Sequence, residues 1–282
     1  MMRKQIEGLI CDEERALYNL THGDVMDCVF SGPADGESAL KEARDVYLDN
    51  CLFSLRYPLW HVQSFKLHDS RMEESCRAAI WYSENGRITD SEFSGPKALR
   101  ECRDIVIHDC NVDSVEFGWN CERIHVEETK LCSEYLFLSS QELTLDRVQV
   151  KGKYSFQYAR NVTIRNSFLN TKDAFWHSKN VTVVDSVIRG EYLGWYSEGL
   201  TLIGCRIIGT QPLCYCKGLK LENCTMEDAD LAFEYSDVDA TIEGHVESIK
   251  NPRSGEITVD SVGKIIVGDA VMPCSGRVIV RE

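Results

Sequence analysis

The sequence has few prolines, no long apolar run and no secretion signal. Six prolines in 282 residues, with no low-complexity stretch, leave little room for disordered linkers. No run of about 18 apolar residues is present, which argues against a transmembrane helix. The acidic residues Asp12, Glu13 and Glu14 interrupt the N-terminal segment, where a signal peptide needs an apolar core. We therefore expect a cytoplasmic protein without a membrane partner.

Established catalytic and cofactor motifs are also missing. The sequence has no phosphate-binding loop, no G-x-S-x-G nucleophile motif and no dinucleotide fingerprint, so we expect no cofactor. Cys214 and Cys216 form a Cys-x-Cys pair, but no second pair follows at zinc-ligand spacing. We therefore expect no metal site.

Positive charge is scarce. Lys and Arg number 31 against 45 Asp and Glu, which gives a net charge of −14. Proteins that bind nucleic acid carry a basic footprint, so this balance argues against a nucleic-acid partner. It also disfavours a polyanionic ligand, unless a local basic patch or a metal offsets the field.

The sequence does contain a repeat. Residues 161–179, 180–198 and 199–217 align without a gap as nineteen-residue units, with apolar residues at positions 2, 4 and 9 and a small residue at position 7. The same frame fits eleven units between residues 22 and 236, with insertions in units 22–44 and 64–84. A fixed period of this length is the signature of a solenoid.

The repeat unit is β rather than α. Its positions 2 and 4, and then 7 and 9, alternate with a period of two, and Val, Ile, Leu and Phe are common there, as in strands. Polar turn formers such as Asp90, Asn166 and Asp185 lie between positions 4 and 7 and mark a corner. With a third strand at about positions 13–18, the unit forms one coil of an all-β, single-stranded parallel β-helix. Stacked coils then share one core.

The phase of the third strand stays open. Positions 14 and 18 are small or apolar, so alternation places 14, 16 and 18 inside and 13, 15 and 17 outside. Arg100 and Gln157 at position 16, and Phe175 at position 15, argue against that phase, and a bulge would reverse part of it. We expect only position 17, with residues such as His177 and Tyr196, to face outward in either case.

We expect a single domain over residues 1–282, because the repeat runs on without a linker. Residues 1–21 would cover the N-terminal edge, which would otherwise pair with other chains, as a strand or as a short helix around Glu13–Leu20. Residues 22–236 would form the coils. Residues 237–282 would add one degraded coil and short strands that close the C-terminal end.

The C-terminal half carries a resemblance. The segments GTQPLCYCKGLKLENCTMEDADLAFEYS (209–236) and ESIKNPRSGEI (247–257) are similar to a bacterial family known as a domain of unknown function. That family is placed among right-handed parallel β-helix proteins of the pectin-lyase-like type. The resemblance implies the fold and its right hand, and the family offers no established activity. In the wider superfamily a Lys or Arg base acts next to a uronate carboxylate, which draws attention to Lys250 and Arg253.

The candidate site is the outer face of the coils in residues 161–236. It combines aromatic rings with carboxyl groups and one imidazole, at position 17 (His177, Tyr196, Tyr215, Glu234), position 16 (Trp176, Trp195) and position 13 (Asp173, Gln211, Asp230). Aromatic faces stack on sugar rings. Glu234 and Asp230 are suited to act as acid and base, with His177 as the group that titrates near neutral pH. This pattern favours a face that binds or processes a carbohydrate.

Two other interpretations apply to the same face. Ladders of like side chains stabilise stacked coils without binding anything. An exposed aromatic stripe also suits a structural or self-association protein that forms a homo-oligomer.

The thirteen cysteines have a structural explanation. Five of them fall at position 7, an inward corner where a small, soft residue packs well: Cys28, Cys51, Cys110, Cys205 and Cys224. In a cytoplasmic protein we expect them to be unpaired thiols.

Overall fold

The structure, a computed structural model, describes residues 2–34 and 36–281. The chain divides into two compact units, residues 1–144 and 145–282. Both are parallel β-solenoids with coils about 19 residues apart, as the repeat predicts. The described residues form strands and turns, and none of them belongs to a helix that could cross a membrane.

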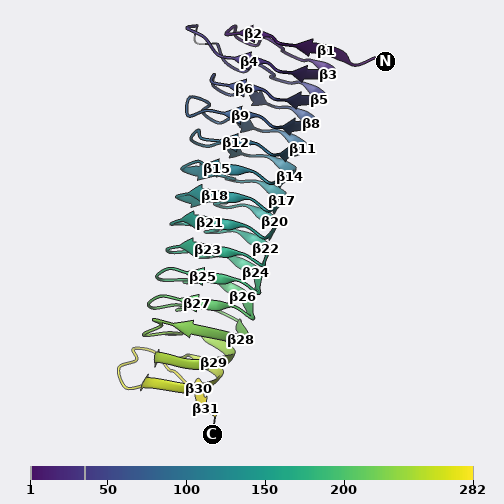
Figure 1. Ribbon diagram of the computed structural model, residues 1–282. Coiled ribbons are helices and arrows are strands. Elements are labelled where there is room, and N and C mark those ends of the chain that lie inside the picture. Colours follow the sequence, from purple (N-terminus) through teal and green to yellow (C-terminus); the bar gives the residue numbers. More distant parts are fainter. Residues whose placement is uncertain (1, 35, 282) are drawn as a thin grey trace. The chain divides into compact units, whose positions relative to one another are not determined.

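In unit 1, each coil contributes two strands, a first one of four to six residues and a second one of two to four residues. The first strands of successive coils stack in one row and the second strands in another (Figure 1). The first row consists of β1 (Lys4–Glu7), β3 (Thr21–Met26), β5 (Arg44–Asp49), β8 (Gln63–His68), β11 (Glu84–Thr89), β14 (Arg103–His108) and β17 (Glu122–Glu127). The second row consists of β2 (Ile10–Cys11), β4 (Val29–Phe30), β6 (Leu52–Phe53), β9 (Arg71–Met72), β12 (Glu92–Phe93), β15 (Asn111–Asp113) and β18 (Lys130–Ser133). A strand β20 (Gln141–Asp146) spans the boundary between the units.

Unit 2 continues the pattern and ends in longer strands. Its first row contains β22 (Arg160–Arg165), β24 (Lys179–Val184) and β26 (Glu198–Ile203), and its second row contains β21 (Gln149–Gly152), β23 (Phe168–Thr171), β25 (Val187–Arg189) and β27 (Arg206–Ile208). From there the two rows merge into β28 (Leu219–Glu227), β29 (Asp237–Lys250) and β30 (Ser254–Ile266), followed by β31 (Arg277–Val280).

The register confirms the inward positions of the repeat. Ile164, Val183 and Leu202, at position 4 of three successive coils, are paired strand to strand and are fully buried. Stacked strands lie about 4.8 Å apart, so each buried side chain packs on its counterpart in the coils before and after it. This continuous column of apolar side chains is what the hydrophobic effect stabilises.

The corner after position 4 forms as the Asx residues predict. Asp90, Asn166 and Asp185 all have positive φ values, between 47° and 52°, a region that Asn and Asp tolerate better than most residues. The next residue points inward. There the Ser167 hydroxyl accepts a hydrogen bond from the Val148 amide and donates one to the Arg165 carbonyl.

Cysteine takes the same corner position in other coils. The Cys205 thiol, for example, lies 3.4 Å from the carbonyl oxygens of Val183 and Ile203. None of the thirteen cysteines forms a disulfide in the structure, and ten of them are buried. Their burial supports the packing role that the repeat predicts for them.

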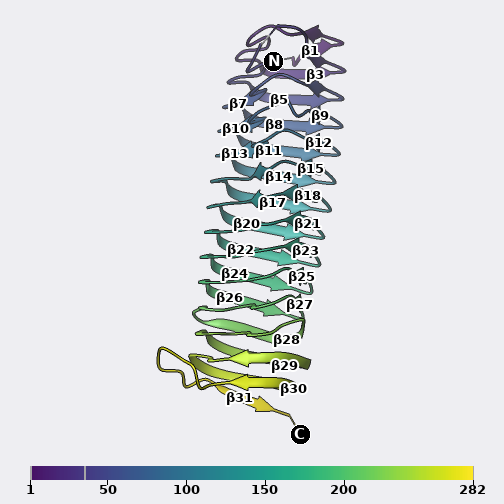
Figure 2. The same ribbon diagram turned by 90° about the vertical axis from the view of Figure 1, so that its left-hand side faces the viewer.

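The predicted third strand is only partly present. In unit 1 it is reduced to two-residue strands, of which Figure 2 labels the first three: β7 (Leu59–Trp60), β10 (Ile80–Trp81), β13 (Leu99–Arg100), β16 (Glu116–Phe117) and β19 (Tyr135–Leu136). In unit 2 it is replaced by turns, in which Asp173, Phe175 and His177 all have positive φ values, from 52° to 61°. Because every second residue has a left-handed conformation, the side chains of this segment do not alternate between inside and outside as they do in a strand.

The consequence is a different pattern of burial. Ala174, Phe175 and Ser178 point inward, whereas Trp176 is half-buried and His177 is exposed. Position 15 is therefore inside and position 16 lies toward the outside, opposite to the phase from alternation. Position 17 faces outward, as expected.

The two chain ends form further coils where caps were predicted. β1 pairs in parallel with β3, and β2 pairs with β4. The helix suggested for Glu13–Leu20 is absent, and residues 14–19 are turns. At the other end β29, β30 and β31 pair in parallel, one after another. The structure thus has about 15 turns, and the prediction of eleven coils was too low.

Candidate functional site

Aromatic rings at position 17 form a continuous outer row in unit 2. Ring centroids lie 5.1 Å apart for Tyr158 and His177, 5.0 Å for His177 and Tyr196, and 4.8 Å for Tyr196 and Tyr215, with interplanar angles of 6°, 7° and 17°. Tyr235 follows at 5.5 Å in a tilted orientation, but it is only 8% exposed, and its hydroxyl accepts a hydrogen bond from the Val271 amide. We call these five residues the ring row. The structure thus brings together three of the predicted residues, His177, Tyr196 and Tyr215.

The geometry of the ring row decides which surface it can offer. The faces of His177 and Tyr196 are each covered by the rings before and after them, so they cannot stack on a sugar. Their edges remain exposed, and Tyr196 keeps 43% of its surface. Among the described residues, the Tyr196 hydroxyl and the His177 ring nitrogens have no hydrogen-bond partner. A sugar ring therefore has no free face of Tyr196 to stack on, and any contact with Tyr196 has to use its edge or its hydroxyl.

Tyr215 differs from Tyr196 in its surroundings. It is half-buried. Burial, and then the nearby charge of Glu234, raise the pKa of its phenol. Its hydroxyl therefore stays protonated and remains able to donate a hydrogen bond.

The two tryptophans hold the coils together from a second row. Trp176 and Trp195 stack with centroids 5.5 Å apart and an interplanar angle of 5°. The Trp176 indole N–H donates to the Tyr192 carbonyl at 2.6 Å, and that of Trp195 donates to the Gln211 carbonyl at 2.8 Å. Both indole N–H groups donate hydrogen bonds to the following coil, so they are not available to a ligand. The two tryptophans therefore stabilise the stacking of the coils.

Asp173 does not lie on the outer surface. Its side chain is only 7% exposed, and this burial raises the pKa of its carboxyl. Gln211 is half-buried, and its carbonyl is the acceptor for Trp195. Neither Asp173 nor Gln211 therefore reaches the ring row as an exposed group.

Glu234 does not belong to the ring row, because the last coil is one residue longer than the frame allowed. The Tyr215 ring contacts that of Tyr235, and the Cys216 amide donates a hydrogen bond to the Ser236 hydroxyl, both at a spacing of 20 residues. The extra residue lies between Glu227, which still pairs with Ile208 at a spacing of 19, and Asp230, whose carbonyl accepts from the Gln211 amide. Asp230 and Glu234 are therefore displaced by one position from their predicted places.

Both displaced carboxylates already have partners. Asp230 accepts a hydrogen bond from the Thr210 hydroxyl. Glu234, with 17% of its side chain exposed, lies 3.0 Å from the Lys250 ammonium, which also lies 3.3 Å from Asp269. Asp269 in turn accepts from the Asn251 amide at 2.7 Å.

The Glu234–Lys250 contact bears on the Lys base that the superfamily resemblance suggests. Hydrogen bonding to Glu234, supported by Asp269, raises the pKa of Lys250. A lysine held protonated in this way is a poor general base near neutral pH. Lys250 is therefore suited to hold the carboxylates of Glu234 and Asp269 by ion pairing, and it is not suited to abstract a proton from a substrate.

Comparison with known proteins places the chain in a family. A family model matches residues 4–279, and its description is "Protein of unknown function (DUF3737)". The chain belongs to this family. This confirms the resemblance to a family of unknown function. No curated protein matches the chain.

One solved structure shows a distant likeness. It is a mutant tailspike protein of E. coli bacteriophage HK620 in complex with a hexasaccharide, at 9% identity and a TM-score of 0.27. The match covers 92% of this chain and 53% of that one, so the chain spans about half the length of the tailspike. A likeness at this level carries no argument about function.

In this member of the family, sequence reasoning left two ring-row residues out of the site. Tyr158 lies at position 17 one unit before the predicted face. Tyr235 is hidden by the frame shift, although the matching pairs Tyr215/Tyr235 and Cys216/Ser236 at a spacing of 20 could have revealed it. Within the described part of the chain, no three His, Cys, Asp or Glu side chains gather in a way that could hold a metal ion.

Proposed function

We propose that this protein binds a carbohydrate along the ring row, without a catalytic step. The observation that supports the proposal is the line of outward ring edges at successive coils. Their faces are already used within the protein, while the Tyr196 hydroxyl and the His177 nitrogens have no partner among the described residues. A row of this kind offers hydrogen bonds rather than stacking.

The spacing of the ring row suits an extended chain of hydroxyl-bearing units. Successive centroids are separated by 5.1, 5.0 and 4.8 Å. This is comparable to the length of one sugar ring in an extended oligosaccharide, so successive monosaccharides can meet successive edges. Hydroxyl and imidazole groups both donate and accept, as sugar hydroxyls do.

The proposal is one of binding because the candidate acid and base groups are engaged elsewhere. Glu234 pairs with Lys250, and Asp230 pairs with Thr210. The ring row itself contains one imidazole, His177, and no carboxyl group, whereas most glycoside hydrolases use two carboxyl groups.

Removing one ring-row hydroxyl at a time tests the proposal. Tyr196→Phe and Tyr215→Phe keep the stacked ring and delete only the outward hydroxyl. A glycan-array screen of the wild type identifies a ligand, and calorimetry then measures its affinity for each variant. Each variant should weaken binding by about threefold to tenfold, the effect of about 0.5–1.5 kcal/mol for one neutral hydrogen bond.

Tyr82→Phe is the matched control. Tyr82 lies in unit 1, stacks on His61 at 5.1 Å, and is 45% exposed against 43% for Tyr196. Its variant should bind like the wild type. Glycan binding that survives both unit 2 substitutions would refute the proposal.

Self-association is the rival function for the same surface. If no glycan binds, and light scattering shows a dimer that weakens in Tyr196→Phe, the ring row serves as an interface between copies of the chain.

A further inference from the structure

A groove lies on the outer face of β3, β5, β8 and β11 in unit 1, far in sequence from the ring row. Its volume is about 730 Å³, within the range of small-molecule sites. Its lining includes three cations and two carboxylates: Arg3, Lys66, Arg87, Asp24 and Asp45, with Tyr47, Ser64 and Asn85 among the neutral residues.

The backbone bends at the same place in each coil along this face. Asp45, Ser64 and Asn85 have left-handed φ values of 50°, 57° and 55°, and the same conformation recurs in later coils at Asp104 and Arg123. The strand pairing skips these residues, as between Arg44↔Gln63 and Val46↔Phe65. Each strand therefore bends in the manner of a β-bulge, and Ser64 and Asn85 line the groove together with Lys66 and Arg87.

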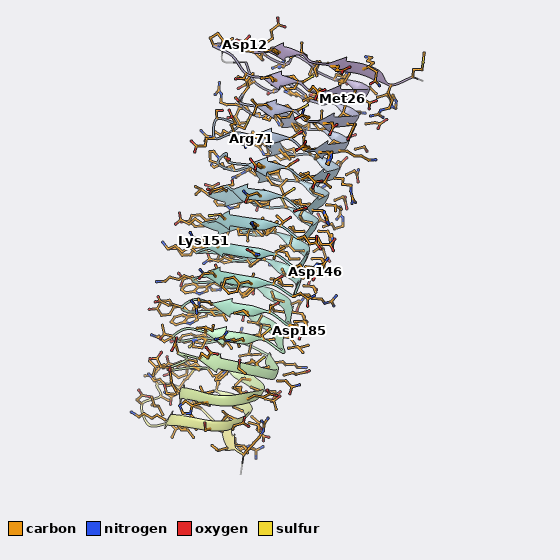
Figure 3. All side chains as sticks on the ribbon, viewed as in Figure 1. Asp12, Met26, Arg71, Asp146, Lys151 and Asp185 are labelled. Atoms are coloured by element: carbon orange, nitrogen blue, oxygen red, sulfur yellow. The ribbon has the colours of Figure 1, made fainter. Side chains whose placement is uncertain are left out.

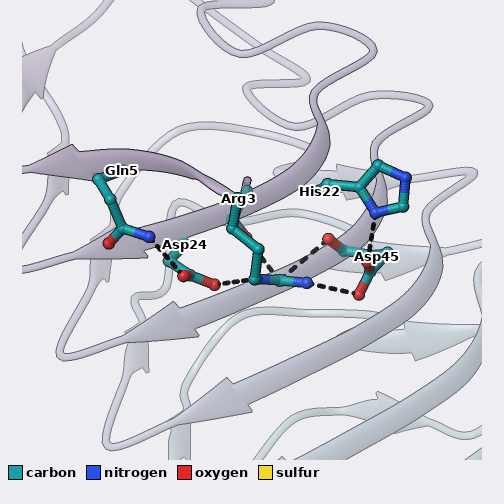
Figure 4. Close-up of polar contacts among 6 residues, drawn as sticks. Arg3, Gln5, His22, Asp24 and Asp45 are labelled. Carbon is teal, nitrogen blue, oxygen red and sulfur yellow. Dashed lines mark hydrogen bonds and ion pairs between the residues drawn. The ribbon is translucent and has the colours of Figure 1, made fainter. Parts of the chain in front are cut away.

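The carboxylates at one end of the groove already have partners (Figure 4). The Arg3 guanidinium contacts Asp24 at 2.5 Å and Asp45 at 2.9 Å. Gln5 donates to Asp24 at 2.7 Å, and the His22 ring lies 2.6 Å from Asp45. These two acidic groups are therefore not available to the cations at the other end.

Those cations, Lys66 and Arg87, lie side by side without a counter-charge. They are directly opposite each other in the register of β8 and β11, about 4.8 Å apart from strand to strand. Both are exposed, and neither has an ion-pair or hydrogen-bond partner for its side chain among the described residues. Like charges directly opposite in a sheet destabilise it.

Many other cations of the protein are paired from coil to coil. Charged side chains on neighbouring coils meet in ion pairs throughout both units: Arg71–Glu92, Arg123–Asp104, Lys172–Glu191, Lys179–Glu198, Arg206–Glu227, Arg253–Asp237 and Arg281–Asp260. In a chain of net charge −14, two adjacent cations left without a carboxylate depart from this arrangement.

We infer that this groove is a binding site for a phosphate or sulfate group. The Arg87 guanidinium presents a planar fork of donors and Lys66 a compact charge, and both side chains are suited to tetrahedral oxyanions. The Ser64 hydroxyl and the Asn85 amide line the same groove and can add neutral donors. Because the groove is larger than the anion, the group is carried by a small molecule or glycan. The inference does not depend on the ring row or on the function proposed for it.

Titration of the full-length protein with four probes tests the inference. Inorganic phosphate and inorganic sulfate report the anion site itself, whereas a phosphorylated hexose and a sulfated disaccharide distinguish the two sources of the group. Calorimetry at low ionic strength should detect at least one free anion, with tighter binding of the matching sugar ester. Binding should weaken when salt is raised to about 0.15 M, where charges are screened beyond about 8 Å.

Lys66→Glu and Lys151→Glu form a matched pair of variants. Lys151 on β21 also extends outward (Figure 3) as an exposed lysine with no partner among the described residues, and it is not one of the residues that line the groove. Lys66→Glu should weaken binding by about tenfold or more, the loss of one charge-assisted hydrogen bond, while Lys151→Glu should leave it unchanged. Thermal unfolding checks that both variants fold. The inference is overturned if no probe binds to the wild type, or if the two variants weaken binding equally.

Discussion

Phe175 provides the sharpest test of how the third segment of each coil is arranged. Strand alternation places position 15 outside, whereas in the structure the Phe175 side chain is fully buried. It stacks on Phe156 with centroids 5.3 Å apart and an interplanar angle of 15°. Phe175→Ala would therefore remove a ring from the core, while an outward phenylalanine could be truncated almost without effect.

The expected loss of stability is large. A buried Phe→Ala substitution costs about 3–5 kcal/mol, through lost burial and the cavity left behind. The neighbouring coil has Gly194 at the same position, with a φ of 75°, so no side chain there can fill the hole. Loss of the Phe156 contact adds about 0.5–1.5 kcal/mol. We expect about 3.5–6.5 kcal/mol in total, a large part of the stability of an ordinary domain.

Urea unfolding, followed by tryptophan fluorescence and by circular dichroism, measures this loss. Agreement of the two probes checks that unfolding is two-state. Phe175→Leu is the control, because Leu213 is fully buried at the same position in a later coil, and it should cost about 1–2 kcal/mol. A loss below about 1 kcal/mol for Phe175→Ala would refute the assignment of position 15 to the core.

Three further predictions concern thiols, acid stability and the C-terminal cluster. Titration of the denatured, non-reduced protein with a thiol reagent should detect close to thirteen thiols, and a lower number would reveal disulfides. In the native protein, the thiols that react fast should be the half-buried ones, Cys11, Cys132 and Cys274. The Arg3 guanidinium holds the pKa of Asp24 below its usual range, so the pair stabilises the fold above the unfolded pKa of about 3.9 and the effect is lost as the pH falls through the folded pKa. Melting curves of Arg3→Met should accordingly lie below the wild type at neutral pH and converge with it in acid, and a constant gap would contradict this. Lys250→Met leaves the half-buried Glu234 without its cation and should cost about 1 kcal/mol or more, whereas Lys151→Met should not change the melting temperature.

Much of the fold follows from local residue preferences, and the same preferences recur in each repeat unit. Ile164, Val183 and Leu202 recur at one position of the unit, and an apolar residue that recurs in every coil must face the shared core. Asn166 and Asp185 mark the corner because their side chains tolerate left-handed backbone. Each of these features depends on a residue and its immediate neighbours, so a single sequence is enough to predict it.

The third segment and the site depended on the tertiary structure. Phe175 takes a left-handed conformation that is unusual for a phenylalanine, because packing against Phe156 outweighs its local preference. The one-residue shift before Asp230 replaced Glu234 with Tyr235 in the ring row. The juxtaposition of Lys66 and Arg87 was not predicted, because 21 residues separate them in the sequence. They lie opposite each other only because β8 pairs with β11. A periodic sequence therefore determines which residues are buried in regular strands, whereas packing between coils decides how irregular segments turn and which charges meet.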